Sequence, residues 1–108
     1  MQAGQLRNQI TIQSKTETTD SYGGTVSAWS DFATVMAKIR PLRGRELVAA
    51  QAAQSEAEVM FYLRYLSGVE SSMRIAHEST YYDIVSIVDV DFRHKELEIS
   101  TKTGLSEG

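Results

Sequence analysis

The side chains that could support acid–base or metal chemistry are scattered along this 108-residue sequence. The two histidines, His77 and His94, are isolated, and neither stands in a recognisable catalytic or metal-ligand motif. Asp89 and Asp91 could offer oxygens to a hard cation, but the oxygens of one turn seldom suffice. The sequence has no glycine-rich phosphate loop, nucleophile elbow or HExxH zinc motif. We therefore expect a protein that is not an enzyme and has no catalytic residue, cofactor or metal.

The strongest basic feature is a group of three arginines, Arg40, Arg43 and Arg45, between a predicted strand and a predicted helix. Guanidinium groups bind carboxylates and phosphates, so the group is a candidate contact site for an acidic partner or for passing DNA. A solvated turn is the alternative interpretation. The aromatic residues are not interleaved with basic ones, which favours a place in the core or an interface over base stacking.

Composition limits the class of protein further. The net charge of −3 is not typical of a protein that grips nucleic acid through its phosphates. No apolar run approaches the roughly 20 residues that span a bilayer, and the first residues do not resemble a secretory signal. The absence of cysteine fits folding in a reducing cytoplasm. We expect one globular domain over residues 1–108 that does not contact a membrane.

Most of the sequence alternates between apolar and polar residues, the pattern of half-buried strands. The alternating segments, six or so strands in all, cover residues 6–13, 26–32, 33–40, 59–65, 73–78, 81–90 and 96–101, and the second runs almost directly into the third. Residues 81–90 are apolar on both faces, which predicts a strand that is covered on each side. The tail, residues 103–108, is expected to fray.

Two segments interrupt the alternation. Lys15–Thr25 is polar and contains Gly23-Gly24, which predicts a long mobile loop or an extended hairpin tip. Residues 45–54 are rich in strong helix formers and predict a short helix that covers an open end or edge of the sheet. The expected fold is therefore all-β and mainly antiparallel. It is a small six-stranded β-barrel or sandwich with one short α-helix between the third and fourth strands and a long loop after the first.

A set of short motifs covers the chain from residue 4 to residue 101. They are Gly4-x-Leu6-Arg7-x-x-Ile10-x-Ile12, Asp20-Ser21-Tyr22-Gly23-Gly24, Trp29, Ala37-x-Ile39-x-Pro41, Gly44-x-Glu46, Arg64-Tyr65, Met73-Arg74-Ile75, Tyr82-Asp83-Ile84-x-x-Ile87 and Arg93-x-x-x-Leu97-x-Ile99. Each motif is weak alone, but their order and spacing resemble phage head–tail joining proteins of siphophage type, also called head-closure or head–tail adaptor proteins.

The resemblance implies a structural virion protein at the head–tail interface, assembled in the host cytoplasm. Such proteins form a ring, commonly dodecameric, with a portal-bound adaptor ring above and tail proteins below. DNA passes through the central channel without sequence-specific binding, and in some members the loop after the first strand helps to close it. The candidate channel residues are then Lys15, Glu17, Asp20, Ser21, Tyr22, Gly23, Gly24 and Thr25.

Two other functions stay open. One is a different tail component, such as a tail-completion or tail-terminator protein, which stays possible because a fold does not fix a function. Such a protein would copurify with tails rather than with DNA-filled heads. An oligonucleotide-binding barrel would bind single strands in a salt-dependent way.

Overall fold

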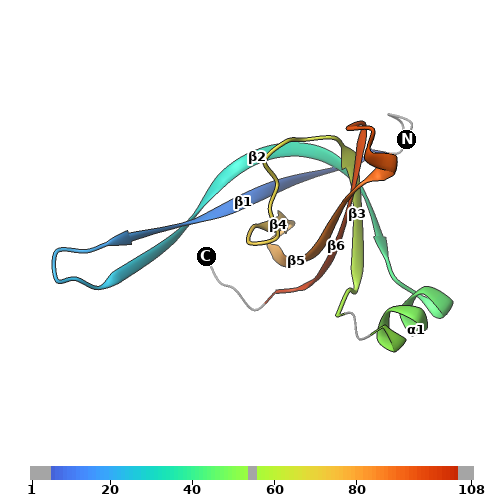
Figure 1. The fold of residues 1–108 in the computed structure, drawn as a ribbon, viewed down its shortest axis with the longest axis horizontal. Helices are drawn as coiled ribbons and strands as arrows, with labels where there is room; N and C mark the ends of the chain where they lie inside the picture. The colour runs from blue at the N-terminus through green and yellow to red at the C-terminus, as the bar shows by residue number, and fades with distance from the viewer. Residues whose placement is uncertain (1–5, 54–55, 105–108) are drawn as a thin grey trace.

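The structure, a computed structural model, describes residues 6–53 and 56–104. In this part of the chain six strands alternate with turns, and one short helix and one 3-10 turn interrupt them (Figure 1). The elements are β1 (Asn8–Thr19), β2 (Thr25–Pro41), α1 (Gly44–Ala52), β3 (Val59–Arg64), β4 (Arg74–His77), β5 (Thr80–Asp89), η2 (Val90–Phe92) and β6 (Glu96–Thr103). The expected all-β fold of six strands is confirmed. Neither helical segment in the described ranges has the length and apolar character needed to cross a bilayer.

The strands form a closed antiparallel barrel in the order β1-β2-β3-β6-β5-β4. Three residue pairs close it, because β1 meets β4 only at Thr11↔Ala76, Ile12↔Ile75 and Gln13↔Arg74. The last strand of the sequence, β6, lies between β3 and β5 and pairs with both. Closure leaves the barrel without a free sheet edge.

Alternating side chains fill the interior as the pattern predicts. The buried apolar core is made of Ile10, Ile12, Ala37, Phe61, Leu63, Met73, Ile75, Ile84, Leu97 and Ile99. The expectation that β5 is covered on both faces is wrong: Ile84 is buried, whereas Val88 is 50% exposed. A barrel of this kind has a single interior, so no second sheet covers the outer face of β5.

The two strands expected over residues 26–32 and 33–40 are one strand, β2. No turn separates them; instead the register against β1 shifts, so that Ile12 pairs with Ala33 and Gln13 with Asp31. Phe32 is the extra residue of this β-bulge, which bends a strand without ending it. The helix therefore follows the second strand instead of the third.

Beyond the bulge, β1 and β2 leave the barrel together as a projecting hairpin, residues 14–30, here called the arm (Figure 1). The arm makes the molecule elongated, with extents of 50 × 31 × 28 Å. Of the two possibilities for Lys15–Thr25, the structure has the extended hairpin: β1 continues to Thr19, β2 begins at Thr25, and only the turn between them lies outside a strand.

The helix α1 matches the expected segment closely but does not cover the barrel. None of its residues is buried, and Val48 is 65% exposed. The barrel is closed by β1 and β4, so no edge requires a cover, and the small side chains of the alanine-rich helix offer little to bury. At the other end of the chain Thr103 pairs with Tyr82, and Gly104 donates its N–H to the Tyr81 carbonyl at 2.8 Å. Residues 105–108 of the expected frayed tail lie outside the described residues.

Replacing Phe61, which is 0% exposed, with alanine should lower the free energy of unfolding by about 3–5 kcal/mol, because the change leaves a cavity in the core. Urea denaturation followed by far-UV circular dichroism measures the loss. The matched control is Phe92→Ala: Phe92 is 89% exposed, and the change should stay within about 0.5 kcal/mol. Equal losses for the two variants would contradict the assignment of the core.

Candidate functional site: the arm and the arginine junction

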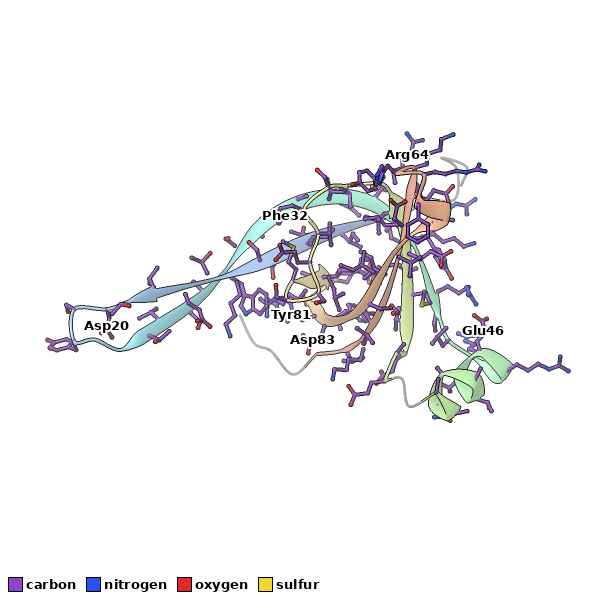
Figure 2. The ribbon with its side chains drawn as sticks, viewed as in Figure 1. Asp20, Phe32, Glu46, Arg64, Tyr81 and Asp83 are labelled. Atoms are coloured by element: carbon purple, nitrogen blue, oxygen red, sulfur yellow. The ribbon has the colours of Figure 1, made fainter. Side chains whose placement is uncertain are left out.

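Asp20 lies at the tip of the arm (Figure 2), in a turn that is closed by hydrogen bonds. The Asp20 carboxylate oxygen Oδ1 accepts the backbone N–H groups of Tyr22 at 2.9 Å and Gly24 at 2.8 Å. The backbone of Asp20 donates to the Gly24 carbonyl at 2.8 Å and accepts from Gly23 at 3.1 Å. Gly23 has φ of +83°, and a Cβ on Gly24 would lie 3.0 Å from Asp20 Oδ2. The two glycines therefore serve the geometry of a closed turn.

The surface of the arm is polar and weakly acidic. Its charged side chains are Lys15, Glu17 and Asp20, which sum to −1. Lys15 Nζ and Glu17 Oε1 are 4.0 Å apart, and both side chains are exposed. Tyr22 at the tip is 96% exposed. The arm can therefore present two carboxylates and one aromatic ring to a partner.

The root of the arm is held by a buried arginine that the sequence pattern does not reveal. Arg74 is 1% exposed, and its guanidinium carbon Cζ lies 4.2 Å from the centre of the Trp29 ring and 3.8 Å from that of Tyr81. Arg74 Nε donates to Gln13 Oε1 at 2.8 Å. Alternation correctly places Arg74 on the outer face of β4, away from Met73 and Ile75. It cannot show that an aromatic residue from β2 and one from β5 cover that face.

The three arginines between β2 and α1, Arg40, Arg43 and Arg45, here called the arginine junction, are only partly available for contacts. Arg40 forms a bidentate ion pair with Glu46 of α1: Nη1 donates to Oε1, and Nη2 donates to Oε2 at 2.7 Å. Nη2 also donates to the Tyr62 hydroxyl at 2.8 Å. Arg43 and Arg45 are exposed, and no carboxylate in the described part of the chain pairs with either. Of the three candidate residues, Arg40 therefore fixes the start of α1, while Arg43 and Arg45 face solvent.

Of the titratable groups singled out from the sequence, His94 and Asp89 lie in contact, whereas His77 lies in a different part of the barrel. His94 Nδ1 is 2.5 Å from Asp89 Oδ2, and the half-buried His77 has its Nε2 4.0 Å from Glu78 Oε1. The side chain of Asp91 lies outside the described residues. Within residues 6–53 and 56–104 no three His, Cys, Asp or Glu side chains gather as a metal site would require. The two regions that the structure offers for contact with a partner are the arm and the exposed arginines Arg43 and Arg45.

Comparison with known proteins agrees with this description. The family model for the phage head completion protein matches residues 1–104 of the chain. The chain belongs to the phage head completion protein family. Its curated relatives include the head completion protein gp7 of Enterobacteria phage HK97, which is 28% identical over 109 residues and aligns over 96% of this chain and 97% of the relative. The expected head–tail joining family is thereby confirmed, and with it a structural role in completing the phage head.

Two solved structures share the fold. The solution structure of protein SF1141 from Shigella flexneri 2a superposes with a TM-score of 0.77 and 24% sequence identity, over 99% of this chain and 100% of that one. A chain from the virion of a native gene transfer agent particle gives a TM-score of 0.58 and 13% identity, over 94% of this chain and 97% of that one. At these identities both support the barrel fold of the head completion protein.

The contact with Arg40 lowers the pKa of Glu46 below its ordinary value of 4.5, chiefly through the hydrogen bonds and then through charge attraction. The ion pair should therefore be intact above the ordinary pKa and be lost as the pH falls through the lowered one. A carbon-13 NMR titration of the side-chain carboxyl should give a midpoint below 4.5 for Glu46. In Arg40→Met the midpoint should return to the ordinary value. Arg45→Met, at a neighbouring exposed arginine, is the control and should leave the midpoint unchanged; a similar change in both variants would contradict the assignment.

Proposed function

We propose that this chain closes the head of a tailed phage as a ring beneath the portal, seals the DNA channel after packaging and provides the surface to which the tail attaches. The observation that carries the proposal is the family match over residues 1–104. The structure supports a role in contacts, because two differently charged regions project from the barrel, the arm and the α1 end (Figure 1). The protein would reside in the virion at the head–tail interface, after assembly in the host cytoplasm.

The shape of the molecule suits a ring. A ring forms when two different surfaces of one chain bind each other head-to-tail and the rotation closes. The arm is weakly acidic, whereas Arg43 and Arg45 make the start of α1 basic, and the two regions project in opposite directions. We propose a homo-oligomer, dodecameric as in the family it resembles, with the portal-bound adaptor ring above and tail proteins below.

The acidic balance of the chain suits a channel wall. DNA must slide through such a ring, and like charges do not hold it. The candidate channel residues from Lys15 to Thr25 belong to paired strands and a hydrogen-bonded turn. If they line the channel, opening and closing would move the arm as one unit. Their role as a gate remains a prediction.

Disruption of the gene should leave separate, normal tails beside tail-less heads, many of which have lost their DNA, because nothing closes the portal or receives the tail. Electron microscopy of the lysate measures both populations. Full, stable heads with malformed or absent tails would instead support a tail-completion or tail-terminator protein. A gel shift with single-stranded DNA at low salt tests the oligonucleotide-binding alternative, and we expect no shift.

Reversing the charge of the two exposed arginines, Arg43→Glu with Arg45→Glu, should reduce the titre of joined particles in a complementation assay by about 10-fold or more. A loss of about 1.4 kcal/mol, within the range of a single interface arginine, already corresponds to this factor. Arg93→Glu, at an exposed arginine in the turn after η2, is the matched control and should complement normally. An unchanged titre in the double variant would exclude this junction as an assembly contact.

A further inference from the structure

The direction of the arm relative to the barrel is fixed by few contacts. Among its residues, 14–30, only Ser14 and Trp29 are partly covered, and the rest are exposed. Pairing of β1 with the barrel strand β4 ends at Gln13. The Phe32 bulge lies at the same level and interrupts the ladder between β1 and β2. A hairpin that leaves a barrel at a bulge would swing unless another contact restrained it.

The Arg74 stack supplies that contact. Its parts come from all four strands at the arm's root: Gln13 from β1, Trp29 from β2, Arg74 from β4 and Tyr81 from β5. Trp29 belongs to the arm, three residues from the bulge at Phe32, and pairs with Lys15 of β1. Tyr81 belongs to the barrel, where it pairs with Ala76 (Figure 2). The guanidinium between the two rings therefore connects the arm to the barrel wall.

The chemistry of the contact selects arginine. A flat guanidinium can stack on two aromatic faces at once and still donate from its edge, whereas a lysine ammonium is a compact point charge. A buried cation is costly unless it is hydrogen-bonded. No buried side-chain nitrogen or oxygen atom of the described residues lacks a hydrogen-bond partner. Arg74 is thus both almost fully buried and satisfied.

We propose that Arg74 is the positioning residue that sets the direction of the arm. Arg74 lies at the point where the arm leaves the barrel, so a small change of angle there moves the tip of the arm by a larger distance. From Lys15 to Thr19 the arm rises four residues, or about 13 Å at about 3.3 Å each, before the turn begins. A small rotation at Trp29 therefore displaces Tyr22 much further. The structural part of the proposal stands on the stack alone; its consequence for head–tail joining rests on the function proposed above.

Double electron–electron resonance, which measures the distance between two spin labels, tests the structural part of the proposal. The chain has no cysteine, so Ser21→Cys at the tip and Val88→Cys on the exposed face of β5 can carry two specific nitroxide labels. With Arg74 present, the distance distribution should be narrow. In Arg74→Met it should at least double in width, and in Arg74→Lys it should also broaden. Arg93→Met, at an exposed arginine away from the arm, should leave it unchanged.

A second variant guards against simple misfolding. Trp29→Leu removes one ring of the stack and keeps both Arg74 and its bond to Gln13, so it should broaden the distribution while the barrel stays folded by circular dichroism. If Arg74→Met does not fold, Trp29→Leu with Tyr81→Leu carries the test. A distribution as narrow and centred at the same distance as in the parent protein, in folded variants that lack the stack, would overturn the proposal.

Complementation separates this proposal from the proposed function. Folded Arg74→Met should reduce the titre of joined particles at least five-fold, whereas Arg93→Met should not. A broadened distribution with an unchanged titre would show that Arg74 orients the arm but that joining does not need a fixed direction, which overturns the functional part. If gene disruption left joined, full particles, the proposed function would fail while the distance measurement would still decide the role of Arg74.

Discussion

The fold depends on the short pairing between β1 and β4, because these three residue pairs turn a curved sheet into a closed barrel. The pairing is also why the arm exists. β1 is 12 residues long, yet β4 has only four, so β4 can accompany only a small part of β1. The part of β1 beyond Gln13 has β2 as its sole strand partner and leaves the barrel with it. Ile12, which is fully buried, packs against the core from the inner face of this β1–β4 pairing.

The outer face of the β1–β4 pairing is covered by a different kind of contact. Inside the barrel, aliphatic side chains pack without direction, and the gain comes from removing apolar surface from water. Outside, Arg74 is covered by two aromatic rings whose orientation matters, and its edge is bound by Gln13. A non-directional core fixes where the strands lie, and a directional stack can fix the angle at which two of them depart.

The sequence shows the core because alternation reports burial directly. Ile10, Ile12, Phe61 and Leu63 lie where the period of two places them, and the helix falls within two residues of its expected ends. The continuity of β2 is not visible in the sequence, because a bulge at Phe32 and a turn give the same break in alternation. Only the partner strand tells them apart.

The contact surfaces were only partly predictable for the same reason. The tip motif Asp20-Ser21-Tyr22-Gly23-Gly24 is local, so its turn can be read from residue types. The bond between Arg40 and Tyr62 joins residues 22 positions apart, and that between Gln13 and Arg74 joins residues 61 apart. Such pairings follow from strand order, which alternation does not contain. Trp29, the largest apolar side chain of a mostly polar hairpin, is a local sign that something covers it.

The place of β6 in the barrel has a consequence for how the protein is made. The ribosome delivers this strand last of the six, yet it belongs between β3 and β5. Until residues 96–103 emerge, both of those neighbours present unpaired ladder edges, which are the surfaces through which sheets associate wrongly. The barrel can therefore close only after most of the chain has been synthesised. A chain terminated before residue 96 would keep the unpaired edges of β3 and β5, which can pair with other chains. Rapid capture of the final strand therefore protects the yield of correctly folded subunits.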